Sequence, residues 1–393
     1  TKLDHEIEKY NPETGELVAW VEVRSLSGTN NTDIYIYYGN TSLGEDENQE
    51  NPAGVWSNNF REVWHLHETA GGTVADSASS GYSGTAFAGV NQNPATEKIG
   101  GADGFDGSTG AYEELNDGTL TANSPFTLEG WFYLQNAMPD ESYLPFPEKN
   151  RDYPDSQDWV GLYAVYDTSW VGPYPILSFG WGSTKGGNLN GTTPLAPGQW
   201  YHAVGTFDGT TRRLYLNGTQ ENTDTGVATY TDLTSPSRIG NDGVNSFYLN
   251  GFVDEVRISN IVRPPEWIQT QYNNQKAPAA FYTVGIEETD GTGADPFDNG
   301  WQYSKKITIL ASEVADVLTN FPLLIKTTDP DWADTSNGGY VAQSDGGDFL
   351  FMAGNRITKL DHEIESYDET TGELVAWVEV LSLSDSQDTD IYI

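Results

Sequence analysis

The chain has 393 residues, of which 37% are hydrophobic and 12% aromatic, so it is long enough to bury two or three domain cores. The 19 Lys and Arg residues oppose 58 Asp and Glu residues, and the resulting formal charge of −39 makes nucleic acid and anionic lipid surfaces poor partners. The absence of cysteine excludes disulfides and thiolate metal sites, and no apolar run approaches the roughly 18 residues that a membrane-spanning helix needs.

A stretch of 36 residues occurs twice in the chain. Residues 1–36 and residues 358–393 are identical at 27 of 36 aligned positions, with a constant offset of 357 residues. The 9 differences, such as Arg24 against Leu381, indicate two diverged copies of one motif. We therefore expect one period of a longer array, in which each end is completed by strands of a neighbouring copy joined head to tail.

The repeated stretch predicts three strands, at residues 3–10, 16–23 and 33–38 in the first copy. In the second of these strands Leu17 and Val21 share one side, and Trp20 lies on the other. In the first strand three carboxylates alternate, which places them on one face; they are Asp4, Glu6 and Glu8, with counterparts Asp361, Glu363 and Glu365. This pattern resembles the catalytic strand of retaining β-glucanases, but a solvated acidic face explains it better, so we expect no enzyme activity.

Strand patterns at short spacing follow along the chain, divided by Gly, Asn and Asp turns. They fall at residues 60–67, 126–134, 176–181, 200–207, 212–216 and 252–258, and later at 301–309, 321–326 and 348–352. A short turn near residues 265–272 is the one helical feature that we expect, and the spacing predicts antiparallel sheets packed as a sandwich. His65 and His67 share a strand face, and we interpret them as ordinary sheet histidines rather than metal ligands.

Five blocks in the middle of the chain carry a family resemblance. They are VWHLHETAGGTVADSASSGYSGTA, FTLEGWFYL, GQWYHAVGTFDGTTRRLYLNG, SRIGND and LNGFVDEVRIS. In this order they resemble the laminin-G-like, concanavalin A-type jelly-roll family across about residues 61–283.

The two chain ends carry a second resemblance. The blocks WQYSKKITI, NFPLLI, DGGDFLF, LDHEIE, AWVEV and IYIYYGN resemble a domain family of unknown function that commonly precedes laminin-G-like domains in large microbial surface proteins. The first three blocks occur near the C-terminal end and the last near the N-terminal end, so neither end holds the whole domain.

The laminin-G-like resemblance implies a structural Ca²⁺ ion held at a sheet edge. On the matching blocks, its ligands would be Asp76 of the VADSAS turn and Asp254 of the FVDEV block. Calcium takes six to eight oxygen ligands, which short Asp and Gly turns supply. The alternative is that Asp76 caps an Asx turn and that Asp254 pairs with Arg257 or another basic group.

Aromatic residues gather between Met138 and Gly182, a segment that we interpret as an insertion. Trp159, Trp170 and Trp181 are the candidates for stacking on a glycan. Packing of the insertion onto its own sheet, or onto a neighbouring subunit, explains the same residues equally well.

Together these patterns predict an all-β protein with an antiparallel jelly-roll sandwich and a second β-sandwich domain split across the chain ends. The expected parts are residues 1–60 as the C-terminal half of the split domain, 61–283 as the jelly roll, 284–300 as a linker, and 301–393 as the split domain without its last strand. The expected function is a structural and adhesive repeat unit of a very long extracellular surface protein or filament. Its partners would be neighbouring copies of the same repeat, with glycans as further partners. The alternative is a carbohydrate-binding module of a larger secreted, glycan-active protein.

Overall fold

The computed structural model describes residues 3–11, 16–21, 34–38, 51–78, 80–87, 89–92, 94–108, 110–116, 124–149, 159–181, 187–225, 236–241, 247–289 and 300–393. In residues 3–11, 16–21 and 34–38 it describes the backbone and the side chain of Glu6; in residues 283–289 and at Trp181 it describes the backbone alone. The chain divides into two compact units, here called the split unit (Thr1–Asn58 with Gln269–Ile393) and the jelly-roll unit (Asn59–Ile268). No helix within these ranges has the length and apolar character to cross a membrane.

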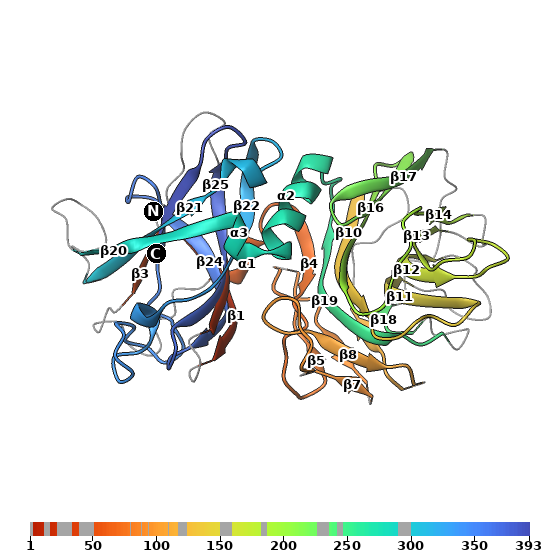
Figure 1. The fold of residues 1–393 in the computed structure, drawn as a ribbon, viewed down its shortest axis with the longest axis horizontal. Helices are drawn as coiled ribbons and strands as arrows, with labels where there is room; N and C mark the ends of the chain where they lie inside the picture. Colours follow the sequence, from red (N-terminus) through yellow and green to blue (C-terminus); the bar gives the residue numbers. More distant parts are fainter. Residues whose placement is uncertain are drawn as a thin grey trace. The chain divides into compact units, whose positions relative to one another are not determined.

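The jelly-roll unit consists of two antiparallel sheets (Figure 1). The first has the order β17-β16-β15-β10-β19-β8-β7, with β4 also paired to β19. Its strands are β4 (Phe60–Trp64), β7 (Val90–Asn91), β8 (Asp103–Asp106), β10 (Phe126–Leu134), β15 (Trp200–Phe207), β16 (Thr211–Leu216), β17 (Thr219–Thr225) and β19 (Asn250–Ser259).

The second sheet of the jelly-roll unit has the order β14-β13-β12-β11-β18-β9-β6-β5. Its strands are β5 (Thr73–Val74), β6 (Gly84–Ala86), β9 (Glu113–Leu115), β11 (Ser142–Lys149), β12 (Val160–Tyr166), β13 (Ile176–Trp181), β14 (Leu189–Asn190) and β18 (Ser237–Ile239).

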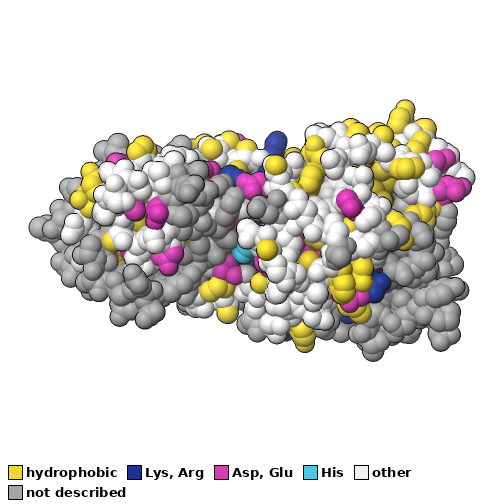
Figure 2. Space-filling model, turned by 90° about the horizontal axis from the view of Figure 1, so that it is seen from below, with side chains coloured by type: hydrophobic (Ala, Val, Ile, Leu, Met, Phe, Trp, Pro, Cys, Tyr) yellow, Lys and Arg dark blue, Asp and Glu magenta, His cyan; other side chains and the backbone are white. Residues whose placement is uncertain are grey.

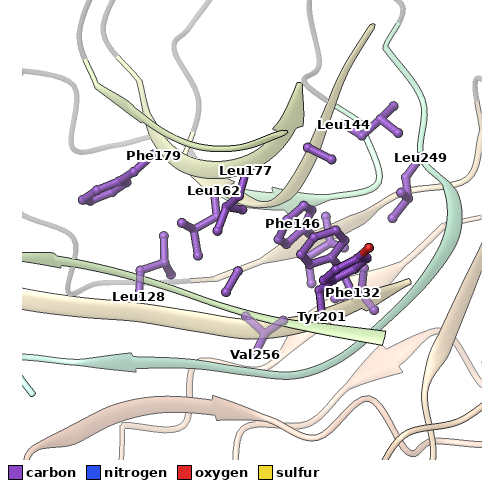
Figure 3. Packing of buried hydrophobic residues seen from close by; sticks show 14 of the residues in the cluster. Leu128, Phe132, Leu144, Phe146, Leu162, Leu177, Phe179, Tyr201, Leu249 and Val256 are labelled. Atoms are coloured by element: carbon purple, nitrogen blue, oxygen red, sulfur yellow. The ribbon is translucent and has the colours of Figure 1, made fainter. Parts of the chain in front are cut away.

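Apolar side chains from both sheets meet in one core (Figure 3). Phe132 of β10 stacks on Phe146 of β11 with ring centroids 4.0 Å apart, and on Tyr201 of β15 at 5.4 Å. Alternate residues of strands such as β10 and β12 point to this core, as expected for two sheets packed face to face. The predicted all-β jelly-roll sandwich is thereby confirmed.

The split unit contains a sheet with the order β1-β2-β22-β25-β24-β23-β26-β3-β21-β20. Its strands are β1 (Leu3–Asn11), β2 (Glu16–Val21), β3 (Ile34–Tyr38), β20 (Tyr282–Thr289), β21 (Tyr303–Ile309), β22 (Leu318–Thr328), β23 (Phe351–Ala353), β24 (Lys359–Asp368), β25 (Glu373–Leu383) and β26 (Thr389–Tyr392). Short helices α1 (Pro52–Val55) and α3 (Pro278–Phe281) and the 3-10 turns η3 (Ala311–Glu313) and η4 (Pro330–Trp332) complete this unit. Leu374, Ala376 and Val378 of β25 are fully buried in its core, which confirms the alternation predicted for this copy.

Three expectations about elements are corrected. Residues 138–182 are not an insertion, because their strands β11, β12 and β13 are integral to the second sheet and contribute core residues such as Leu162 and Phe179. The short turn near residue 265 is the twelve-residue helix α2 (Pro265–Lys276), which begins on a proline. Residues 284–289, expected to begin the linker, belong to strand β20, which pairs with β21.

The N-terminal copy of the repeat was expected to pair with strands of a neighbouring unit. In this structure of a single chain, β1, β2 and β3 pair instead with strands of residues 301–393 of the same chain. They make these pairs within the split unit.

On the face drawn in Figure 2, the acidic side chains do not form one patch. Figure 2 shows Asp and Glu side chains singly or in small groups on one face, among polar atoms and scattered hydrophobic side chains. A distributed charge of this kind favours solubility and does not define a single docking surface.

Candidate cation and glycan sites

Asp76 anchors the loop that follows β5. Its Oδ1 accepts hydrogen bonds from the backbone N–H of Val63 (2.9 Å) and of Ala78 (3.0 Å). Its Oδ2 accepts from the N–H of Tyr82 (2.8 Å) and from the Ser80 hydroxyl (2.5 Å). Both carboxylate oxygens are therefore engaged in holding the turn, as in the Asx-turn alternative.

Asp254 of β19 is fully buried. Its Oδ2 accepts from the backbone N–H of Ile99 (2.8 Å) and of Lys98 (3.2 Å), whereas its Oδ1 has no hydrogen-bond partner among the described residues. Burial, followed by the negative charge of Glu255, raises the pKa of this carboxyl well above its ordinary value. Arg257 forms its ion pair with Glu255 rather than with Asp254.

These two aspartates fit a Ca²⁺ site unequally. Asp254 offers a buried oxygen that lacks a donor, and a cation would offset the cost of keeping that carboxylate ionised. Asp76 would have to give up hydrogen bonds to become a ligand. Within the described ranges, neither residue belongs to a group of three or more carboxylate or imidazole side chains in metal-binding reach.

The structure contains a second set of buried carboxyl groups that the sequence did not predict. Asp103 of β8 and Glu113 of β9 are fully buried and interact with each other, and no donor elsewhere in the described protein reaches their carboxylate oxygens. Burial raises the pKa of Glu113 to about 7. Burial and the charge of Glu113 raise the pKa of Asp103 well above its ordinary value, and Glu68 adds to both shifts. Both residues lie in short strands whose neighbours cannot be read from the sequence.

His65 and His67 are stacked, with ring centroids 5.9 Å apart. His65 Nδ1 lies 3.0 Å from Glu255 Oε1. Burial, followed by the positive charge of Arg257, lowers the pKa of His65 well below its ordinary value, so the imidazole is neutral. Both histidines lie beyond the end of β4 (Phe60–Trp64), with Leu66 between them at a φ of 61°, so the predicted shared strand face is not formed.

The candidate glycan-stacking tryptophans do not form one platform. Trp159 precedes β12 and packs over Gly180 of β13, where an added Cβ would lie 2.6 Å from its Nε1. Trp170 follows the other end of β12 and stacks on Tyr143 with centroids 6.0 Å apart. A strand of this length separates its ends by roughly 20 Å. The side chain of Trp181 lies outside the described residues.

A hollow of about 370 Å³ lies elsewhere on the jelly-roll unit. It combines polar side chains with one aromatic ring, and its lining includes Thr69, Gly72, Phe87, Asn91 and Gln92. Phe87 stacks on Tyr112 at 4.4 Å, which fixes the orientation of its ring.

The acidic strand of the repeat differs from the expected alternating face. In β24 the pairing with β25 shifts between Ile364 and Ser366, so a bulge at Glu365 interrupts the alternation. Glu365 accepts a hydrogen bond from the Trp377 indole (2.8 Å), and Asp361, Glu363 and Glu365 are all fully buried. The interpretation of a solvated acidic face is therefore wrong for this copy, and the side chains of Asp4 and Glu8 lie outside the described residues.

Comparisons with known sequence families agree with this geometry. Residues 106–269 match the concanavalin A-like lectin/glucanases superfamily. This match falls almost entirely within the jelly-roll unit and agrees with its two antiparallel sheets. Residues 1–62 match a domain of unknown function, DUF2341. No curated protein matches the chain.

The solved structures that resemble this chain are distant in sequence. Trypanosoma rangeli sialidase in complex with sialic acid is 17% identical over 57% of this chain, with a TM-score of 0.42. Domain 4 of AbnA, an extracellular arabinanase from Geobacillus stearothermophilus, is 16% identical over 61% of this chain and 98% of its own length, with a TM-score of 0.36. The binding domain of Paraclostridial Mosquitocidal Protein 1 is 12% identical over 78% of this chain and 75% of its own, with a TM-score of 0.43. This chain spans 34% of the sialidase.

Proposed function

We propose that this chain is a non-catalytic structural and adhesive repeat unit of a long extracellular surface protein. The observation that carries the proposal is the internal repeat, which recurs in the structure as two equivalent sets of three strands. β1, β2 and β3 correspond in sequence to β24, β25 and β26 at the constant offset of 357 residues. Two copies of one motif on either side of a lectin-like domain are typical of chains built from repeated units.

The acidic strand supports a structural rather than a catalytic role. A retaining glycosidase needs two carboxyl groups at close range on either side of an open sugar site. Here the Glu365 carboxylate instead accepts a hydrogen bond from Trp377, and that of Glu363 accepts one from Trp56 (3.1 Å). We expect the purified protein not to hydrolyse β-glucans.

The proposal is tested on the parent polypeptide in its source cells. An antibody raised against this chain should detect a polypeptide of several multiples of 43.1 kDa. Protease added to intact cells should degrade it, because the unit is proposed to be extracellular. A single-copy polypeptide that carries a hydrolase domain, or one protected inside the cell, would contradict the proposal.

A second candidate function is carbohydrate binding, which the polar and aromatic lining of the hollow favours. Titration calorimetry with a panel of oligosaccharides tests it, with Phe87→Ala and Trp170→Ala as variants that separate the hollow from the surface around Tyr143. Tyr82→Ala is the control, because this exposed side chain lies outside the hollow lining. Binding that Phe87→Ala abolishes would favour this function; no binding by the wild type would rule it out for the panel.

We also propose that Ca²⁺ binds at Asp254 as a structural ion. Its buried Oδ1 without a donor supports this assignment. Any remaining ligands would be backbone carbonyls and water, which Ca²⁺ accepts readily.

A further inference from the structure

The two copies of the repeat form the same hairpin. In the first copy His5 pairs with Val21 and Glu6 with Trp20; in the second, the counterparts His362 with Val378 and Glu363 with Trp377 pair identically. Both hairpins also contain a bulge at the same place, after Ile7 and after Ile364. Because register and bulge coincide, each copy can present the same backbone groups to a partner strand.

Both copies also select the same partners in the same register. These partners lie on β21, β22 and β23, here called the acceptor strands. Three acceptor positions each have one partner from either copy: Ile325 pairs with Ala19 and Ala376, Ile307 with Ile34 and Ile391, and Ala353 with Ile34 and Ile391. Within each of these pairs of partners the offset is 357, the offset of the repeat.

Two of the acceptor strands, β21 and β23, have room for one copy, whereas β22 lies between β2 and β25. A strand has two edges, and one edge of β21 is held by β20, where Val284 pairs with Ile307. Both β3 and β26 pair with the remaining edge of β21. These two strands also pair with each other in parallel, with Ile34 beside Ile391. Two strands in identical register cannot both make full hydrogen bonds to one edge.

The electrostatics also disfavour placing both copies together. β1 lies parallel to β24, with Glu6 beside Glu363. Both carboxylates accept from the single Trp56 indole N–H, at 2.8 Å for Glu6 and 3.1 Å for Glu363. Like charges at neighbouring positions in a sheet are destabilising, more so when one of them is fully buried as Glu363 is.

We infer that the acceptor strands of this chain pair with the C-terminal copy of the repeated stretch. The N-terminal copy would pair in the same register with the acceptor strands of a neighbouring repeat, which has its own residues equivalent to 301–357. The inference rests on the proposed function, since it requires an array of units. The C-terminal copy has the advantage within its own chain because β23 leads directly into β24, where Phe351 pairs with Leu360. A short connection loses little entropy on closure, whereas the N-terminal copy would close a loop of several hundred residues.

The absence of cysteine in the chain permits a direct test by disulfide trapping. Paired residues of adjacent antiparallel strands are close enough for a disulfide. Two double variants are compared. The pair Ala353→Cys and Ile391→Cys reports pairing of the C-terminal copy, and the pair Ala353→Cys and Ile34→Cys reports pairing of the N-terminal copy. Both pairs are placed in the full chain and in an extended chain in which residues 301–357 are repeated immediately before Thr1.

In both chains the Ile391→Cys pair should oxidise readily to an intramolecular disulfide. In the extended chain, Ile34→Cys should bond to a cysteine placed at the Ala353 position of the added segment. Its disulfide with the original Ala353→Cys should then be at least about tenfold less abundant, which corresponds to a preference of about 1.4 kcal/mol. Non-reducing electrophoresis and peptide mass mapping distinguish the products.

Two results would overturn the inference. One is failure of the Ile391→Cys pair to oxidise, since the C-terminal copy would then not hold the acceptor strands. The other is a persistent disulfide from Ile34→Cys to the original Ala353→Cys in the extended chain. Neither result affects the antibody test of the parent polypeptide, which reads the number of repeats and not the pairing of strands.

Discussion

Glu113 gives the protein a pH dependence between acidic and neutral pH. Burial raises the pKa of its carboxyl from 4.5 to about 7. The folded state then binds the proton more tightly than the unfolded state, so stability is fully present below the unfolded pKa and is lost as the pH rises through the folded pKa. Between pH 4.5 and 7 this group should lower the free energy of unfolding by on the order of 3 kcal/mol.

Glu113→Gln should therefore flatten the pH dependence, because the amide cannot release a proton. Urea unfolding between pH 4 and pH 8 (about the range spanned by the two pKa values) measures the slope. Glu114→Gln is the matched control, since this neighbour is partly exposed and pairs with Arg238. Equal slopes for the wild type and Glu113→Gln would show that the buried carboxyl does not titrate as described.

Asp254 tests the calcium proposal. A ligand that binds the folded state alone raises its stability by mass action, by about 2.7 kcal/mol at one hundred times the dissociation constant. Calcium should raise the melting temperature of the wild type, and Asp254→Asn, which preserves the side-chain shape, should remove that increase. A full calcium response in Asp254→Asn, or none in the wild type after treatment with chelator, would refute the proposed site.

At the scale of elements, Asn274 of α2 secures strand β22. Its side-chain Oδ1 accepts from the Leu324 N–H (2.6 Å) and its Nδ2 donates to the Leu324 carbonyl (3.1 Å). The side chain is fully buried, so Asn274→Ala would leave two backbone groups of the strand without these partners. We expect a loss of about 2–4 kcal/mol in unfolding free energy.

Asn273→Ala is the control for this prediction. Asn273 is partly exposed; it donates to the Glu313 carbonyl (2.8 Å) and accepts from the Gln269 side chain (3.0 Å), and because water can replace these partners the loss should be less than about 1 kcal/mol. Denaturant titration of both variants gives the comparison. Similar losses of unfolding free energy for the two variants would contradict the stabilising role given to the hydrogen bonds between Asn274 and β22.

Helix α2 also shows why part of the fold could not be predicted. The strands β10, β15 and β19 follow clear apolar patterns between turn residues, and they appear where expected. The helix has few apolar residues, and polar bonds such as those of Asn274 attach it, so no helical period was visible. Strand β11 contains Pro145 and Pro147, which argue against a strand in the sequence but are accommodated here.

The candidate sites could also be predicted from the sequence only in part. Asp76 of the VADSAS turn was expected to be a Ca²⁺ ligand, with an Asx turn as the alternative, and the structure supplies the donors of that alternative. The juxtaposition of Asp103 and Glu113 depends on strands from two different sheets, which no local pattern encodes. The bulge at Glu365 likewise arises from pairing between strands and changes the face to which a carboxylate points.

At the scale of the whole molecule, the repeated stretch and the negative charge both support the proposal of an extended array of repeats. The chain carries a formal charge of −39, so neighbouring repeats in the proposed array would repel one another except where specific strand pairs join them. Repeated units joined through neighbours in sequence form extended arrays, whose length grows with the number of units.

Small-angle X-ray scattering of chains with one, two and three units in tandem tests this account most directly. Successive units should be spaced by the 357-residue offset, so that each junction reproduces the Ile357–Thr358 connection. The account predicts that the maximum dimension rises about linearly with the number of units and that all units stay folded. Chains of two and three units that collapse to compact particles, or that unfold at the added junctions, would contradict it.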